Sequence, residues 1–253
     1  MENGLINGIV FIDLRKAFDM VDTDLLLRKL TIYKCDFLTL SWFKSYLQCR
    51  EQCVQFKGNL SSSMPSLQGV PQGSILGPLL FIAFINDLPL YVNSNTDMYA
   101  DDSTIYSSAK TIEELNVKLT HDMCNVHTWC SNNNMVINNS KTKAMVMTSY
   151  QRAATLNSNL HVQFNGMKLT NTENEKLLGI IVNNNLCWKL QIDKVARSLN
   201  KGIHLLRQIK EYLPIRYRVL YYKCFLQTHI DYCSTVWGQS TDVTRIHKLQ
   251  KLQ

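Results

Sequence analysis

The sequence is poor in the two residues that interrupt regular structure: glycine and proline contribute 10 and 5 of the 253 residues. This scarcity excludes a collagen-like chain and a low-complexity chain. A long apolar run is also lacking. The most apolar stretch, residues 75–85, is interrupted by Gly77 and Pro78 and is far shorter than the roughly 20 residues that cross a bilayer. We therefore expect this stretch to be buried core, and we expect no membrane as a partner.

Signals for export and for paired cysteines are missing as well. Residues 1–16 contain no basic segment followed by the small-residue cleavage site of a secretory signal. The eight cysteines form no C-x-x-C pair, so neither a zinc ribbon nor a disulfide framework is indicated. These absences favour free thiols in a reducing compartment. We expect an intracellular protein, in the cytoplasm, the nucleus or both.

What is present is enough apolar material for one large core or two smaller ones, with 45% hydrophobic and 19% charged residues. The charge is unevenly distributed. Residues 1–140 hold 10 Lys and Arg against 14 Asp and Glu, whereas residues 141–253 hold 17 against 6. The basic C-terminal part, residues 141–253, suits contact with a polyanion such as a nucleic-acid backbone, although a solvated basic surface explains the charge equally well.

Apolar periodicity predicts an α+β fold. Strands are predicted at residues 8–13, 135–137 and 144–147, and a hairpin with an acidic tip at residues 97–106. Helices are predicted at residues 22–46 and 76–86, and another from residue 111. Asn165-Gly166 predicts a second hairpin, and residues 177–182 are expected to continue the sheet. After residue 185 the chain is expected to be helical, with a helix starting at Pro214.

Three carboxylates lie at a predicted strand end and a predicted hairpin tip, where we expect a catalytic site. Asp13 ends the first strand, and Asp101 and Asp102 form the tip of the hairpin. The strand order can bring them side by side, and Mg²⁺ prefers such oxygen ligands. Two metal ions can stabilise the attacking and leaving oxygens of phosphoryl transfer. Each feature alone also has an ordinary explanation, because a strand-terminal Asp is usually a turn or cap residue and an Asp pair in a hairpin is usually a solvated turn.

Four motifs occur in order along the chain. They are FIDLRKAFDMV at residues 11–21, QGVPQGSILGPLLF at 68–81, YADD at 99–102 and NNSKT at 138–142. With this order and spacing, the sequence closely resembles a reverse transcriptase, an RNA-directed DNA polymerase. LGIIV at 178–182 and YCSTVWG at 232–238 resemble segments of non-LTR (LINE-type) retrotransposons. The resemblance covers nearly the whole chain.

The resemblance implies a right-hand polymerase fold. A palm, built of an antiparallel sheet with packed helices, would occupy residues 1–149. A primer-grip hairpin region would follow at residues 150–184, and a helical basic thumb at residues 185–253. The fingers would be mostly missing, as in an N-terminally truncated copy, because the sequence begins about a dozen residues before the first motif.

The resemblance also implies the catalytic residues and the metal. Asp13 and Asp101 would be metal ligands, with Asp102 as the second acid of its motif. The backbone carbonyls of Ile12 and Leu14 would add further ligands. Two Mg²⁺ ions, or Mn²⁺ in their place, would serve the reaction. Lys141 would act near the leaving pyrophosphate as a cation or proton donor, although a surface lysine is an equally good explanation.

The remaining implied residues contact substrates. Phe18 would exclude ribonucleotides by packing against the sugar 2′ carbon, although it could also be an ordinary core residue. Gln72, Gly73 and Tyr99 would complete the nucleotide-binding site. The primer grip would include Leu178 and Gly179, and the thumb would contact the nucleic-acid backbone through Lys189, Lys194, Arg197 and Lys201. Asp19, Asp22 and Asp24 fit the start of a helix better than a metal site.

Two functions stay open. The first is polymerisation, with an RNA template, a DNA primer and deoxynucleoside triphosphates as partners. The second is nucleic-acid binding by a catalytically inactive remnant or domesticated fragment that keeps the basic thumb. A viral RNA-templated RNA polymerase is disfavoured, because YADD replaces its usual GDD and Phe18 would block a ribose. The oligomeric state stays open.

Overall fold

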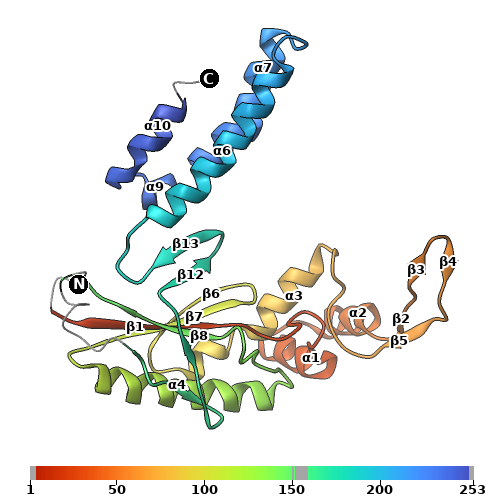
Figure 1. The fold of residues 1–253 in the computed structure, drawn as a ribbon. Coiled ribbons are helices and arrows are strands. Elements are labelled where there is room, and N and C mark those ends of the chain that lie inside the picture. The colour runs from red at the N-terminus through yellow and green to blue at the C-terminus, as the bar shows by residue number, and fades with distance from the viewer. Residues whose placement is uncertain (1–3, 150, 152–158, 251–253) are drawn as a thin grey trace. The chain divides into compact units, whose positions relative to one another are not determined.

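The computed structural model of the chain describes residues 4–149, 151 and 159–250 (Figure 1). The chain forms two compact units, unit 1 (Met1–Asn171) and unit 2 (Thr172–Gln253). The predicted α+β class is confirmed, because unit 1 combines a sheet with helices and unit 2 is mainly helical. The division between the units falls within the predicted hairpin region, residues 150–184. Of that region, residues 150 and 152–158 lie outside the described residues. Along the described ranges, no helix combines the length and apolar character of a membrane span.

A five-stranded sheet with the order β11-β8-β1-β7-β6 forms the centre of unit 1. Its strands are β1 (Ile6–Ile12), β6 (Asn95–Tyr99), β7 (Asp102–Ala109), β8 (Lys143–Met147) and β11 (Thr170–Asn171). The strands β1, β6, β7 and β8 pair antiparallel, as predicted. Strand β11 departs from that prediction, because it pairs with β8 in parallel.

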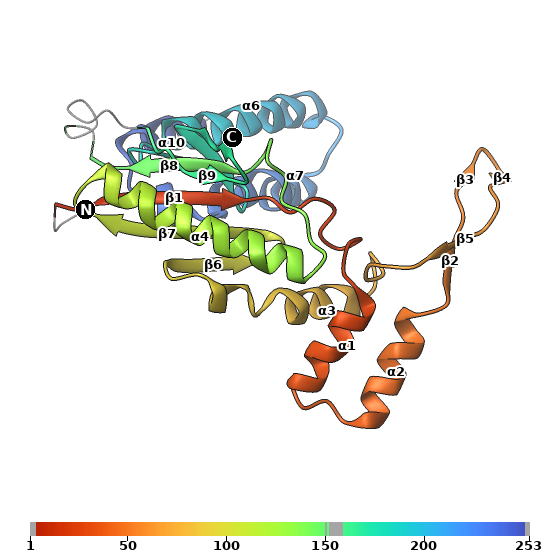
Figure 2. The same ribbon diagram turned by 90° about the horizontal axis from the view of Figure 1, so that it is seen from below.

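Helix α4 (Ile112–Asn132) lies along one face of this sheet (Figures 1 and 2). Gly8 in β1 permits the close approach, since a Cβ at this position would lie 2.8 Å from a side-chain carbon of Leu119 in α4. Side chains alternate between the two faces of a strand, so the buried Val10 and Ile12 share the face of Gly8. Asp13, which follows β1 directly, is therefore directed to the face opposite α4.

Two helices follow β1 where the sequence predicts one. Helix α1 spans Thr23–Ile32 and α2 spans Phe37–Leu47, so the continuous helix predicted at residues 22–46 is wrong. Lys34 has a left-handed backbone with a φ of 63°, and Asp36 caps α2 by accepting a hydrogen bond from the N–H of Thr39 at 2.8 Å. Asp22 caps α1, as expected for a carboxylate at a helix start.

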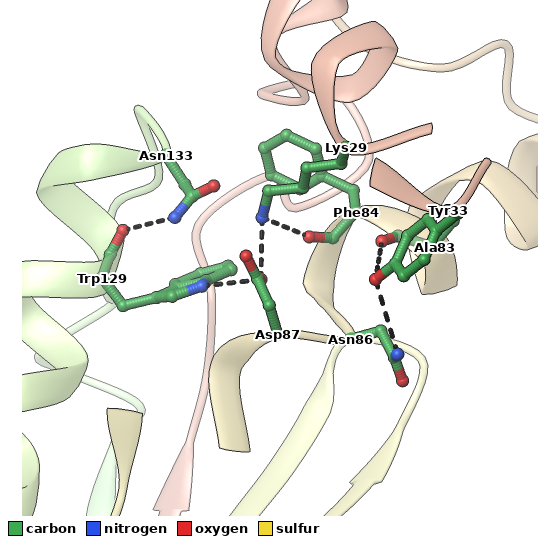
Figure 3. A network of polar contacts seen from close by, with 8 residues as sticks. All are labelled: Lys29, Tyr33, Ala83, Phe84, Asn86, Asp87, Trp129 and Asn133. Carbon is green, nitrogen blue, oxygen red and sulfur yellow. Dashed lines mark hydrogen bonds and ion pairs between the residues drawn. The ribbon is translucent and has the colours of Figure 1, made fainter. Parts of the chain in front are cut away.

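A partly buried ion pair joins α1, α4 and the end of α3 (Leu76–Ile85), as Figure 3 shows. Nζ of Lys29 lies 2.7 Å from Oδ1 of Asp87 and donates to the C=O of Phe84, also at 2.7 Å. Trp129 donates its Nε1–H to the same oxygen of Asp87 at 2.9 Å. Burial lowers the pKa of Lys29, while the hydrogen bond and charge of Asp87 oppose that shift. The carboxylate of Asp87, which follows α3, thus connects α1 and α4 through Lys29 and Trp129.

Several short elements complete unit 1. Between α2 and α3, one long hairpin extends away from the sheet (Figure 2): β2 (Arg50–Gln52) pairs with β5 (Met64–Ser66) at its base, and β3 (Gln55–Phe56) pairs with β4 (Asn59–Leu60) at its tip. Helix α3 is followed by η1 (Leu88–Tyr91). The hairpin predicted around Asn165-Gly166 is confirmed as β9 (Gln163–Phe164) and β10 (Met167–Lys168). The strand predicted at residues 135–137 is wrong, because there the chain makes a single bridge, between Ile137 and Leu14.

Unit 2 begins with a hairpin and continues as helices. Strands β12 (Asn174–Leu177) and β13 (Ile180–Asn183) form a two-stranded sheet of their own, so the prediction that residues 177–182 continue the main sheet is wrong. The helices are α6 (Lys189–Ile209), α7 (Ile215–Tyr221), the π-helical η2 (Tyr222–Gln227), α8 (Thr228–Asp231), α9 (Ser234–Trp237), η3 (Thr241–Val243) and α10 (Thr244–Gln250). Pro214 directly precedes α7, close to its predicted place. Leu199, Leu226 and Trp237 are fully or almost fully buried in the core of this unit.

Candidate active site

The backbone of Asp13 is fixed by the loop that carries Lys141. The N–H of Asp13 donates to Oγ1 of Thr142 at 3.2 Å, and the C=O of Asp13 accepts from the N–H of Asn138 at 2.8 Å. Thr142 is completely buried. The loop is a tight turn, because the C=O of Asn138 accepts from the N–H groups of both Lys141 (3.1 Å) and Thr142 (2.9 Å). The segments that supply Asp13 and Lys141 are therefore firmly joined.

This anchoring also sets the direction of the neighbouring carbonyls. The N–H of Arg15 donates to the C=O of Val136 at 2.8 Å, on the side from which Asn138 binds Asp13. Successive carbonyls of an extended strand point to alternate sides. Those of Ile12 and Leu14 therefore point to the other side, which at Ile12 is the side of β7. Their assignment as metal ligands stays a prediction.

Asp13 and Asp101 line one open pocket of about 390 Å³. Segments far apart in the sequence form its walls: Asp13, Leu14, Arg15, Lys16, Ala17 and Phe18 after β1, Gln72 before α3, Asp101 in the β6–β7 turn, and Asn138 and Lys141 before β8. The pocket thus brings together six predicted site residues, Asp13, Leu14, Phe18, Gln72, Asp101 and Lys141. It combines two carboxylates with three cations, since Arg15 and Lys16 join Lys141.

Asp101 occupies the tip of the hairpin formed by β6 and β7. Tyr99 pairs with Asp102, which leaves Ala100 and Asp101 as a two-residue turn. Ala100 adopts a φ of 52° in this turn. Tyr99 and Asp102 are exposed but do not line the pocket. The turn therefore presents one acid of the YADD motif to the pocket, and the roles of Tyr99 and Asp102 stay predictions.

The loop before α3 is docked on the segment that follows Asp13. The N–H of Gly69 donates to the C=O of Val21 at 2.8 Å, and the N–H of Val70 to the C=O of Phe18 at 2.9 Å. Gly69 has a φ of 84°, and a Cβ there would lie 2.8 Å from the Cα of Asp19. Both the backbone conformation and the close contact require glycine. Backbone bonds thus hold the first and second motifs together.

Gln72 and Phe18 are supported from outside the pocket. Nε2 of Gln72 donates to Oδ1 of Asp19 at 2.7 Å, which directs the amide nitrogen to Asp19 and leaves the amide oxygen for another partner. The ring of Phe18 stacks on Phe81 of α3, with centroids 4.4 Å apart. Phe81 is completely buried, so Phe18 rests on the core while it lines the pocket. Gly73 has a φ of 80° and is exposed beside Gln72, outside the pocket lining.

The donor set of the pocket fits Mg²⁺. Within the described ranges, no group of three or more His, Cys, Asp or Glu side chains could hold a metal ion. The pocket offers two carboxylates, those of Asp13 and Asp101. Mg²⁺ is commonly held through one or two carboxylates and keeps water and substrate phosphates as its other ligands. Two carboxylates beside three cations therefore suit a metal that binds together with a phosphate-rich substrate.

In unit 2, two side chains hold the tip of the β12–β13 hairpin. Leu178 and Gly179 form the turn, with φ values of 46° and 85°. Tyr232 donates its hydroxyl to the C=O of Leu178, and Lys194 donates its ammonium to the C=O of Gly179, both at 2.6 Å. Lys194 therefore supports the hairpin, and its contact with nucleic acid stays a prediction. The same holds for Leu178 and Gly179 as a primer grip.

The other predicted thumb cations lie on the solvent side of α6. Lys189, Arg197 and Lys201 are exposed. Residues at helical spacing between them, Ile192, Val195 and Leu199, are buried in the core of unit 2. Helix α6 is thus amphipathic with a basic outer face. Its contact with nucleic acid stays a prediction.

Some residues that support these sites are not predicted from the sequence. Thr142 and Tyr232 lie within motifs that carry the resemblance, which is the only signal of their importance. Arg15 and Lys16 line the pocket although the sequence suggests no role for them. Asp19, which the sequence assigns to a helix start, binds Gln72.

The chain matches the sequence model of a family described as "Reverse transcriptase (RNA-dependent DNA polymerase)" over residues 2–182. The chain belongs to this family. This reverse transcriptase chain is 28% identical to the RNA-directed DNA polymerase from the mobile element jockey of Drosophila funebris, and the match covers 97% of the chain and 27% of that protein. It is 25% identical to the probable RNA-directed DNA polymerase from transposon X-element of Drosophila melanogaster, over 96% of the chain and 27% of that protein. These relatives confirm the predicted resemblance to retrotransposon enzymes, of whose length the chain spans about a quarter.

Solved structures support the fold of this reverse transcriptase chain. Telomerase from Candida albicans, in complex with the TWJ fragment of telomeric RNA, superimposes with a TM-score of 0.51 at 11% sequence identity. The match covers 99% of the chain and 49% of the telomerase chain. The likeness is one of fold, and it is consistent with a polymerase palm.

Proposed function

We propose that the chain is the palm and thumb of a retrotransposon RNA-directed DNA polymerase, which adds deoxynucleotides to the 3′ end of a primer on an RNA template. The observation that carries this proposal is the pocket that gathers Asp13, Asp101 and Lys141 from three distant segments. In this assignment the palm occupies residues 1–149, the primer grip residues 150–184 and the thumb residues 185–253. The names of the matched relatives support the same activity.

The charges of the pocket suit a nucleoside triphosphate. Asp13 and Asp101 would hold two Mg²⁺ ions, which would supply positive charge to neutralise the phosphates and the attacking oxygen. Arg15 and Lys16 attract the phosphate oxygens from the wall that follows Asp13. Lys141 lines the same pocket from the loop before β8, and its ammonium offers a proton to the leaving pyrophosphate. The hydrogen bonds between Asp13 and the loop that carries Lys141 hold these two segments in a fixed relative position.

Phe18 and Gln72 select the sugar and position the nucleotide. The Phe18 ring cannot move away from the sugar of the nucleotide, because it is stacked on the buried Phe81. A ribose 2′-hydroxyl therefore collides with it, whereas a deoxyribose does not. Gln72 presents its amide oxygen to the nucleotide, since its amide nitrogen is directed to Asp19, which accepts a hydrogen bond from it.

The basic thumb holds the template and primer. Exposed Lys189, Arg197 and Lys201 contact backbone phosphates without regard to sequence. The matched telomerase structure contains RNA, which supports an RNA template for this chain. The intracellular location stays a prediction.

Primer extension tests the proposal. The full chain is incubated with a primed RNA template, deoxynucleotides and Mg²⁺, alongside Asp101→Asn and the control Asp97→Asn. Asp97 is an exposed carboxylate of β6 outside the pocket. We expect extension to be abolished by Asp101→Asn, because a neutral amide cannot neutralise metal charge, and to be retained by Asp97→Asn.

Equal extension by the wild-type chain and Asp101→Asn would reject the assignment of Asp101. A second function, nucleic-acid binding without catalysis, is favoured by the excess of 17 cations over 6 acids in residues 141–253. It would replace the first if the wild-type chain bound primer–template in a salt-sensitive manner but extended nothing.

A further inference from the structure

A second pocket, of about 380 Å³, lies within unit 2 and apart from the residues assigned above. Helices α6 and α7, the first residue of η2 and the last residue of α10 form its walls. Its aliphatic lining residues are Ile203 and Leu206 of α6 and Ile215 and Val219 of α7, which form its apolar side. This volume is within the range of pockets that take a single small ligand. It is small for a helix, whose diameter with side chains is about 10 Å or more.

The polar part of this pocket is cationic. Arg207, Lys210 and Arg218 line it, and its described lining includes no Asp or Glu. Nε of Arg218 is buried and has no hydrogen-bond partner among the described residues. A buried donor without an acceptor costs free energy, which a ligand oxygen would recover. The pocket is therefore suited to a ligand that carries an anionic group next to an apolar group.

An aromatic ring and an amide complete the lining. Tyr222 is the first residue of the π-helical segment η2, and Gln250 is the last residue of α10. Single π-helical turns occur frequently at functional sites. Aromatic rings stack on nucleobases of any sequence, and an amide can bond a base edge. A nucleotide carries both an anionic phosphate and an aromatic base. One nucleotide therefore supplies both of the groups that the pocket suits.

We propose that this pocket binds one unstacked nucleotide of a single-stranded nucleic acid. Its base lies against Tyr222 and the apolar side, and its phosphate lies on Arg218, Arg207 and Lys210. The inference deepens the proposed function, because the nucleic acid is the ligand class of that function, but it needs neither Mg²⁺ nor catalysis.

Binding of two fluorescein-labelled 12-mers to the full chain tests the pocket. One is oligouridylate and the other is an abasic strand of equal length and charge. Tyr222→Leu keeps apolar volume but removes the ring, and we expect it to weaken oligouridylate binding at least fivefold, in keeping with about 1–3 kcal/mol per stacked base. Abasic-strand affinity should change less than twofold. Arg218→Gln should weaken both strands.

Matched controls lie on α7, which carries Arg218 and leads directly into η2. Tyr217→Leu and Arg216→Gln alter exposed residues of α7 outside the pocket, so each should change affinity less than its partner variant does. Tyr222→Phe keeps the ring and should bind like the wild type. Equal losses with Tyr217→Leu and Tyr222→Leu, or equal losses for the two strands with Tyr222→Leu, would overturn the proposal.

A second measurement covers the case in which Tyr222→Leu does not fold. Oligouridylate that contains 5-iodouridine is crosslinked to the wild-type chain by ultraviolet light, and the crosslinked peptides are mapped by mass spectrometry. A crosslink at Tyr222 supports the pocket, and crosslinks confined to residues outside it overturn the proposal. Both assays are run without Mg²⁺ and deoxynucleotides, so no polymerisation takes place in them and failure of the polymerase assignment is distinguished from failure of this one.

Discussion

At the scale of single residues, the hydroxyl of Thr142 links the Asp13 backbone to the loop that carries Lys141. The bond spans 129 positions of sequence, and the hydroxyl is completely buried. Reacting groups must be held to within a fraction of an ångström, and a displacement of about 1 Å can cost a hundredfold in rate. Thr142 is therefore a positioning residue for Asp13.

Replacement of Thr142 tests this role. Thr142→Val keeps the shape but removes the acceptor of the Asp13 N–H, so we expect kcat in primer extension to fall about tenfold to a hundredfold. KM for deoxynucleotides should change little, and Thr142→Ser should restore most of kcat. The loss of one buried hydrogen bond should also cost about 1 kcal/mol of the free energy of unfolding. Equal kcat values for the Val and Ser variants would contradict the role.

Two cysteines of α4 differ sharply in their surroundings. Burial raises the pKa of Cys130 to about 12, whereas Cys124 is exposed on the same helix. The thiolate is the reactive form, so Cys130 should resist alkylation at pH 8. We expect iodoacetamide to modify Cys124 in the native chain, and Cys130 only after denaturation, as read by peptide mass spectrometry. Equal native labelling of both thiols would show that α4 does not pack as described.

The sequence indicates which residues form the active-site pocket better than it indicates what supports them. Asp13, Asp101 and Lys141 stand in motifs of fixed order, and the structure places all three at one pocket. The bond between Asp19 and Gln72 joins side chains 53 positions apart, and no local pattern specifies it. Supporting contacts of this kind depend on the packing of distant segments, which periodicity does not reveal.

At the scale of elements, the sequence predicts regular structure well where periodicity is strong and less well at interruptions. Helix α4 and the β6–β7 hairpin agree with their patterns. The break between α1 and α2 is missed, because apolar residues continue through it while Lys34 takes a left-handed backbone. The β12–β13 hairpin is misassigned to the main sheet, because strand patterns do not identify the pairing partner.

The contact among α1, α3 and α4 depends on Lys29, and Lys29→Met should weaken it. The substitution leaves Asp87 with Trp129 but without its cation. Removal of one partner from a buried pair typically costs about 3–5 kcal/mol. The side chain of Asp87 is 30% exposed, so we expect a smaller loss of unfolding free energy, about 2–3 kcal/mol, measured by urea denaturation.

Lys44→Met is the matched control for this substitution. Lys44 lies exposed on α2, so its replacement should change the unfolding free energy by less than about 0.5 kcal/mol. If Lys29→Met were no more destabilising than Lys44→Met, the ion pair would not be a support of unit 1.

At the scale of the whole molecule, the charge is divided between the parts of the chain. Residues 1–140 have four more acids than cations, whereas residues 141–253 have eleven more cations than acids. An acidic part suits the metal-binding side of phosphoryl transfer, and a basic part suits a polyanionic backbone. Under the proposed function, metal ions would bind in the acidic part of the chain and the nucleic-acid backbone would contact the basic part.

The salt dependence of nucleic-acid affinity measures how many phosphates the basic part of the chain contacts. For single-stranded nucleic acid, the slope of log affinity against log salt is about −0.7 for each neutralised phosphate. Replacing Lys189, Arg197 and Lys201 of α6 by Gln should therefore reduce the steepness by about 2 if each contacts a phosphate. Affinity would be measured by fluorescence anisotropy with the full chain between about 50 and 200 mM salt, where the counterion effect is large.

The control removes the same charge from unit 1. Lys44, Lys57 and Lys110 are exposed lysines outside the basic part of the chain, and their triple replacement by Gln lowers the net charge equally. We expect this variant to keep nearly the wild-type slope, because released counterions come from phosphates in contact and not from net charge. If both triple variants lowered the slope to the same extent, the basic face of α6 would have no special part in binding, and its assignment to the thumb contact would have to be abandoned.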